Sequence, residues 1–164
     1  MENEEKISMY LLPNGKNLYI HTKVKAIFSN YIQIHSKSHE SGGFILGYEN
    51  AKTGSIIIDE LTVPQKKDTH SRYRFSIKDK QHFIDMNNFR KKESFFLGTW
   101  HTHPQDRITP SFIDWIDWKA SMRNESPAAL YMIFIIVGRQ EIAVWAGNRQ
   151  TKKIIRIKEV SINE

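Results

Sequence analysis

The chain has 164 residues, a formal net charge of +6 and no cysteine. This length predicts one domain spanning residues 1–164, and its 40% hydrophobic residues suffice for a buried core. The lack of cysteine excludes disulfides, thiolate zinc ligands and cysteine nucleophiles. No apolar run approaches the roughly 20 residues that span a bilayer, and residues 1–6 are too polar for a secretion signal. We therefore expect a cytoplasmic protein with no membrane partner.

The basic residues are scattered along the chain in short clusters that acids and apolar residues interrupt. A pI near 9.5 would suit nucleic acid, an anionic partner surface or simple solubility. The scatter favours ordinary solvated faces, so we expect no nucleic-acid partner.

The first third of the chain alternates strand and helix signals. Residues 9–12 and 18–20 flank a Pro-Asn-Gly-Lys turn and predict a hairpin. From Thr22, a candidate N-cap, apolar residues recur at helical spacing and predict a helix over residues 22–35. Residues 43–48 and 55–63 then predict a second hairpin across the turn formers of residues 50–54.

The middle of the chain begins with residues 64–74, which are polar and aperiodic and predict a mobile loop beside the functional site. Ser76 and Asp79 are spaced as a capping box for a helix that ends near residues 90–92. We expect His82, on that helix, to be a surface residue.

A strand from Phe95, a helix over residues 110–124 and strands over 130–137, 141–146 and 153–160 complete the chain. The fold class predicted from this order is α/β, a single curved mixed sheet with helices packed on it.

The most informative stretch is Leu-Gly-Thr-Trp-His-Thr-His-Pro, at residues 97–104, at the end of the Phe95 strand. His101 and His103 are two residues apart, so both point to one face of the strand and can share a metal. Pro104 stops the strand, and a helix begins near Pro110. Asp114 in its first turn can supply a third ligand, which leaves one tetrahedral position open, as in catalytic zinc sites.

Each piece of this pattern also has an ordinary structural explanation. Half-exposed strands often carry such histidine pairs, and Ser111 with Asp114 has the spacing of a capping box. A helix start can be both capped and catalytic.

Together, His-x-His-Pro, six residues and Ser-x-x-Asp resemble the signature of the JAMM (JAB/MPN) metalloprotease family. Residues 40–47, Glu-Ser-Gly-Gly-Phe-Ile-Leu-Gly, resemble the segment in which that family carries its general base, here Glu40. The resemblance implies a deaminase-like α-β-α sandwich and zinc held by His101, His103 and Asp114. Ser111 would then donate a hydrogen bond to the developing oxyanion.

The resemblance also implies a substrate, the extended C-terminal tail of a ubiquitin-like or similarly conjugated protein, added as a strand beside the site. Gly42 and Gly43 would let such a tail approach the backbone closely. Within the family, the chain looks like the bacterial deconjugases of antiphage CBASS operons, which release a cyclic-nucleotide synthase from its targets. An acid commonly precedes the tryptophan in that group, where this chain has Thr99.

Two alternatives come from the same family. RadC-like proteins share the motif spacing and are associated with DNA, although they usually carry an N-terminal helical segment for which about 20 residues leave no room. MPN scaffolds bind partners without catalysis, but they lose metal ligands, and here the motif is complete.

Overall fold

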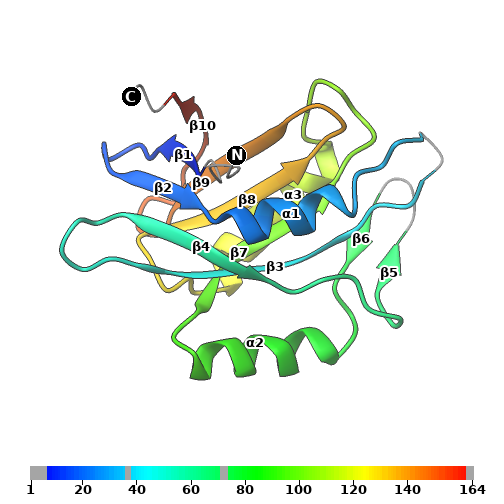
Figure 1. The fold of residues 1–164 in the computed structure, drawn as a ribbon, viewed down its shortest axis with the longest axis horizontal. Helices are drawn as coiled ribbons and strands as arrows, with labels where there is room; N and C mark the ends of the chain where they lie inside the picture. Colours follow the sequence, from blue (N-terminus) through cyan, green and yellow to red (C-terminus); the bar gives the residue numbers. More distant parts are fainter. Residues whose placement is uncertain (1–6, 36–37, 71–73, 162–164) are drawn as a thin grey trace, which may run out of the picture.

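The computed structural model describes residues 7–35, 38–70 and 74–161 (Figure 1). Its strands are β1 (Ser8–Leu11), β2 (Asn17–Ile20), β3 (Gly42–Glu49), β4 (Ile56–Leu61), β5 (Thr69–His70), β6 (Phe75–Ser76), β7 (Phe95–Thr102), β8 (Tyr131–Val137), β9 (Ile142–Asn148), β10 (Ile154–Ile157) and β11 (Glu159–Val160). The helices are α1 (Thr22–Ser29), α2 (Gln81–Lys91) and α3 (Phe112–Asn124). Within these ranges, no helix has the length and apolar character that a membrane crossing needs. The polar residues 1–6 lie outside the description.

Nine strands form one mixed sheet in the order β10-β9-β8-β7-β3-β4-β2-β1-β11, while β5 and β6 pair separately. The two predicted hairpins, β1 with β2 and β3 with β4, are both antiparallel as expected. At the centre, β7 and β8 run parallel, and α3 lies in the crossover between them. Because such a crossover starts at the end of the first strand, the end of β7 lies near the start of α3.

The two faces of β8 belong to two different cores. All seven of its residues are buried. Its odd-numbered residues from Tyr131 to Val137 share a cluster with Val24 and Phe28 of α1, and its even-numbered residues share one with Trp118 and Met122 of α3. Because alternate side chains point to opposite faces, α1 and α3 cover opposite faces of the sheet, as Figure 1 shows. The predicted α-β-α sandwich is confirmed.

The last predicted strand, residues 153–160, is two strands in the structure. β10 pairs with β9 at one end of the sheet, and β11 pairs with β1 at the other. Between them, the Lys158 carbonyl accepts a hydrogen bond of 3.1 Å from the Leu11 N–H. One short segment therefore joins both ends of the sheet, which requires the sheet to curve strongly.

The first helix is shorter than its apolar periodicity predicted. It ends at Ser29 instead of residue 35, and its N-cap is His21, whose Nδ1 accepts the Lys23 N–H at 3.1 Å, instead of Thr22. Beyond the helix, Gln33 is 2% exposed whereas Ile34 is 68% exposed. After the helix, the chain buries the Gln33 side chain in a polar contact that is described below and leaves Ile34 exposed, so it does not continue the predicted apolar stripe.

The second helix also differs at its start. Lys80 is its N-cap without a side-chain hydrogen bond, and Ser76 lies in β6, so the predicted capping box is wrong. Asp79 instead accepts the backbone N–H groups of Gln81 and Lys67. His82 is fully buried, which corrects its expected surface position. The expected loop at residues 64–74 contains β5 and the approach to β6; residues 71–73 lie outside the description, and mobility of this segment stays a prediction.

Candidate active site

Strand β7 directs two histidines to the α3 side of the sheet. Trp100 points to the other side, where its ring lies 5.2 Å from Phe28 and 5.7 Å from Tyr31. His101 therefore faces α3, with its ring 6.4 Å from that of Trp118. His103 follows the strand end, and its Nε2 lies 3.2 Å from Nε2 of His101. The expectation that both imidazoles share one face is confirmed.

Asp114 reaches the same point from the first turn of α3. Ser111 is the N-cap: its Oγ accepts the Asp114 N–H at 3.1 Å, and Asp114 Oδ2 accepts the Ser111 N–H at 2.8 Å. The expected capping box is thus present, with aspartate in place of glutamate. The Asp114 oxygens also lie 3.0 Å from Nε2 of His101 and 3.1 Å from Nε2 of His103.

These three side chains fit a zinc ion. Tetrahedral bonds of about 2.0–2.1 Å place neighbouring ligand atoms roughly 3.3 Å apart. The Nε2 atoms of His101 and His103 are 3.2 Å apart, Oδ1 of Asp114 lies 3.0 Å from the first and Oδ2 lies 3.1 Å from the second, and each of these separations is close to that value. Two imidazole nitrogens and one carboxylate oxygen form a donor set typical of catalytic zinc.

A further contact orients one of the imidazoles. Nδ1 of His103 lies 3.0 Å from Oε1 of Gln105, an oxygen that can only accept. Nδ1 must therefore carry a proton, so His103 presents a lone pair to the shared centre when its Nε2 gives up the proton that bonds to Asp114. Gln105 Oε1 also accepts the Thr109 N–H at 3.1 Å, which fixes the loop that carries it.

Asp114 stays ionised in this setting. Burial alone would raise the pKa of its carboxyl, but hydrogen bonds from His101 and His103 outweigh burial and hold the pKa well below its usual range. Burial would likewise lower the pKa of His103, yet its bonds to Asp114 and Gln105 raise it on balance. A carboxylate that is always charged is suited to bind a cation.

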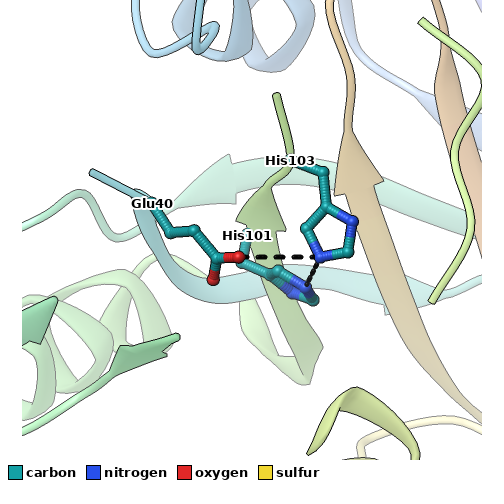
Figure 2. Close-up of side chains that lie close together, drawn as sticks. All are labelled: Glu40, His101 and His103. Atoms are coloured by element: carbon teal, nitrogen blue, oxygen red, sulfur yellow. Dashed lines mark hydrogen bonds and ion pairs between the residues drawn. The ribbon is translucent and has the colours of Figure 1, made fainter. Parts of the chain in front are cut away.

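Glu40, just before β3, lies somewhat farther from the histidines than Asp114 does. It is 5% exposed, and its Oε1 is 3.7 Å from Nε2 of His103. Figure 2 shows its carboxylate pointing toward both imidazoles. The ligand atoms of Glu40, His101 and His103 all lie within 4.8 Å of one another, so these three could also hold an ion. Asp114 is the better third ligand because its oxygens are nearer to both histidines.

Burial sets the acidity of Glu40. It raises the pKa of the carboxyl to about 7, although His101 and His103 partly oppose the rise. A dication beside the carboxylate would oppose it further. Without a metal, a carboxyl in this range can both take up and release a proton near neutral pH.

Thr102, between the two histidines, ties the strand to the segment that carries Glu40. It is fully buried, and its hydroxyl donates to Oε1 of Gln33 at 2.7 Å while accepting the Ser41 N–H at 2.9 Å. The Gln33 amide in turn donates to the Ser38 carbonyl at 2.6 Å. Neither Thr102 nor Gln33 was predicted as a site residue, yet their bonds join the strand that carries His101 to the segment that carries Glu40.

Thr102→Val, which removes the hydroxyl at nearly constant volume, should therefore lower kcat by about tenfold or more, as loss of an orienting partner usually does. Zinc content should not change, because His101 and His103 point to the opposite face. Thr102→Ser keeps the hydroxyl and should retain most of the activity. Elemental analysis and single-turnover rates test this prediction, and equal rates for the valine and serine variants would contradict it.

A groove of about 380 Å³ leads away from these side chains between the β6 segment and α3. Residues lining it include Glu40, His101 and Asp114 at the site, Phe75, Ser76 and Phe83 on one side, and Asp117, Trp118 and Ser121 on the other. Arg74, beside β6, forms an exposed ion pair of 2.8 Å with Asp117 of α3. The ion pair joins the two walls but adds little stability, because both groups are solvated.

Gly42 and Gly43 do not open onto free space, contrary to the reasoning that made them substrate-binding candidates. A Cβ on Gly42 would lie 2.5 Å from the Trp100 carbonyl oxygen and 2.7 Å from the Phe75 ring. A Cβ on Gly43 would lie 2.2 Å from the carbonyl oxygen of Thr62. Both glycines make room for the chain itself, and Gly42 lets the Phe75 wall approach β3.

Comparison with known proteins agrees with this geometry. Residues 32–157 match the family described as prokaryotic homologs of the JAB domain. The chain belongs to this family. The family resemblance of the two sequence motifs is thereby confirmed, and the matched region includes every side chain of the candidate site.

Relatives of this JAB-domain protein are named for an activity. This chain is 31% identical over 150 residues to a protein of Escherichia coli (strain TW11681) named CD-NTase/cGAS isopeptidase. The match covers 90% of this chain and 91% of that protein. A Vibrio cholerae serotype O1 protein of the same name is 26% identical over 134 residues, covering 80% and 81%. Among solved structures, a protein of Desulfitobacterium hafniense superposes with a TM-score of 0.55 at 16% identity, covering 86% and 88%. That structural likeness supports the fold alone.

Proposed function

We propose that this JAB-domain protein is a zinc-dependent isopeptidase that removes a conjugated protein from its target. The observation that carries the proposal is the convergence of His101, His103 and Asp114, with contacts of 3.0–3.2 Å, and the position of Glu40 Oε1 3.7 Å from Nε2 of His103. A non-catalytic scaffold has no use for a complete ligand set with a buried carboxyl beside it. The names of the relatives support the same activity.

In the proposed reaction, His101, His103 and Asp114 hold the metal. When bound, zinc activates a water molecule and polarises the scissile carbonyl. Glu40 accepts the proton that this water loses as its oxygen bonds to the carbonyl carbon. Glu40 then returns the proton to the departing lysine amine as the C–N bond breaks. The products are a free carboxylate on the tail and a free amine on the target, with no acyl-enzyme.

The Ser111 hydroxyl can donate a hydrogen bond in this reaction. Its Oγ accepts the Asp114 N–H, so its O–H can donate to the carbonyl oxygen as negative charge develops there. Because the charge appears only in the transition state, the bond should affect kcat more than KM.

Ser111→Ala should retain zinc but lower kcat by about 10²-fold, the scale for one oxyanion donor. It should also destabilise the protein by about 1 kcal/mol through loss of the helix cap. Ser111→Gly separates the two effects, because glycine is tolerated at an N-cap but offers no hydroxyl. A normal kcat for the glycine variant would show that the serine acts only as a cap.

The proposed substrate is a protein conjugated through its C-terminus, here a cyclic-nucleotide synthase of the kind that the relatives are named for. We assign the extended tail to the groove that leads away from the site, and strand addition is a recurring way to hold such a segment. In the described residues, β3 and β7 are paired on both sides, so the main sheet has no free edge at the site. β6 pairs only with β5 and lines the groove, so we place the added strand beside β6.

A series of tail fusions tests this function. A synthase tail joined to a carrier protein should be cut at the junction, whereas short dipeptides should react poorly, because remote main-chain contacts support orientation at the metal. Proline at a ladder position removes a donor and should block cleavage. Cleavage is followed on gels with zinc-loaded protein. Equal cleavage of every fusion and of unrelated unfolded proteins would indicate a general peptidase instead.

A further inference from the structure

A second polar network, which the proposed reaction does not use, lies buried between α2 and β4. His82 is fully buried; its Nε2 lies 2.5 Å from Oδ2 of Asp68, and its Nδ1 lies 2.7 Å from Oγ1 of Thr62. Thr62 Oγ1 also accepts the Phe44 N–H at 2.7 Å. Every group is satisfied when Nε2–H donates to Asp68 and the Thr62 hydroxyl donates to Nδ1.

Asp68 clamps both ends of the β5–β6 hairpin. It immediately precedes β5, and its Oδ2 accepts the Gln65 N–H at 2.8 Å. Its Oδ1 accepts the N–H groups of Lys78 and Asp79, which follow β6, at 2.9 and 3.0 Å. Burial alone would raise the pKa of Asp68, but these bonds and that of His82 hold it below its usual value. A charged carboxylate is the acceptor that can hold several donors at once.

The clamped hairpin is the wall of the groove beside Glu40. Phe75 of β6 lies against Gly42 and lines the groove together with Glu40. His39, which precedes Glu40, has its Nδ1 2.8 Å from Nδ1 of His70 in β5. The hairpin thus meets the site on its inner side, and Asp68 connects its base to the sheet through His82 and Thr62.

Thr62, His82 and Asp68 have the residue types and order of a nucleophilic triad. Thr62 is only 1% exposed, and its hydroxyl oxygen already bonds to Phe44 and His82. None of the three residues lines the groove. No carbonyl carbon can reach that oxygen, so the arrangement serves to hold the structure and not to attack a substrate.

We propose that Asp68, His82 and Thr62 form a positioning relay that holds the β5–β6 hairpin against the groove and thereby sets the affinity for the substrate tail. This role rests on the proposed function, because it assigns the tail to the β6 wall. It assigns no direct contact between the three residues and the substrate. Breaking the relay should weaken tail binding and leave the metal site in place, since His101, His103 and Asp114 belong to other elements.

The test uses the full chain with two single substitutions and one matched control. Thr62→Val removes the hydroxyl at nearly constant volume, and Thr62→Ser keeps it. Asp68→Asn removes the charge and leaves one acceptor oxygen where Asp68 uses two, so the bonds to His82 and to the backbone amides cannot all be kept. For each protein we would measure zinc content, amide exchange at Gln65, Lys78 and Asp79, and kcat and KM on the longest tail fusion that the wild type cuts.

For Thr62→Val and Asp68→Asn we expect about tenfold faster exchange at those amides, unchanged zinc, and a KM rise of about tenfold that exceeds any fall in kcat. Thr62→Ser should behave as the wild type. Unchanged exchange and KM in both variants, or loss of zinc from them, would overturn the relay. If only Asp68→Asn folds, its values decide.

The two proposals fail separately. A zinc-loaded wild type that cuts no tail fusion would overturn the proposed function. Amide exchange would still test the relay: faster exchange confined to the hairpin amides supports it, and unchanged exchange rejects it.

Discussion

His103→Ala should remove both zinc and hydrolytic activity. The imidazole of His103 lies at the centre of the site, 3.2 Å from Nε2 of His101 and 3.1 Å from Oδ2 of Asp114. Alanine leaves one nitrogen and one carboxylate, too few for a stable catalytic zinc site. Loss of an outer partner of a ligand costs up to about 100-fold in affinity or activity, so loss of the ligand itself should cost well over that.

Elemental analysis of purified protein, before and after treatment with a chelator and reloading with zinc, measures this effect directly. The native protein should carry about one zinc, as expected for a single three-ligand site. His35→Ala is the matched control, because His35 is exposed and belongs to no part of the site. Wild-type protein that neither contains nor takes up zinc would reject the enzymatic proposal.

More of the candidate site than of its surroundings could be predicted from the sequence, because the spacing rules that place its histidines and aspartate act within single elements. The period of a strand places His101 and His103 on one face, and the first turn of a helix offers Asp114 to the same point. Those rules act over a few residues and hold once the elements form. Glu40 lies about sixty positions upstream, and only the family motif pointed to it.

The same local rules failed where a distant polar contact decides the structure. Apolar spacing continued α1 to residue 35, but Gln33 leaves the helix and bonds to Thr102, a residue far away in sequence. His82 was expected at the surface, yet Asp68 and Thr62 supply the partners that make its burial favourable. No periodicity within one segment contains that information.

Gly42 and Gly43 show a third kind of limit. In the sequence, two glycines follow closely after Glu40, and their lack of side chains suggested room for a substrate. The structure fills that room with Phe75 and Thr62, because strand β3 is approached from both sides by its own chain. The glycines and the relay at His82 thus act on the same feature, the position of the groove wall.

Glu40→Gln should keep zinc while hydrolysis falls by about 10²-fold or more, the usual scale for a general base. The carboxylate lies 3.7 Å from Nε2 of His103, whereas both Asp114 oxygens lie closer to a histidine. Glutamine preserves the size of the side chain but cannot take a proton from water. Single-turnover rates on a tail fusion measure the chemical step, and elemental analysis gives the metal content.

The metal content of this variant also identifies the third ligand. Glu40, His101 and His103 are close enough to form an alternative ligand set, and in that case Glu40→Gln would lose zinc while Asp114→Asn would keep it. Our assignment requires the reverse, since the Asp114 carboxylate bridges both histidines at 3.0 and 3.1 Å. Glu49→Gln, at the exposed end of the strand that Glu40 precedes, serves as the control and should match the wild type in both measurements. A Glu40→Gln protein that cleaves at the wild-type rate would show that another group takes the proton.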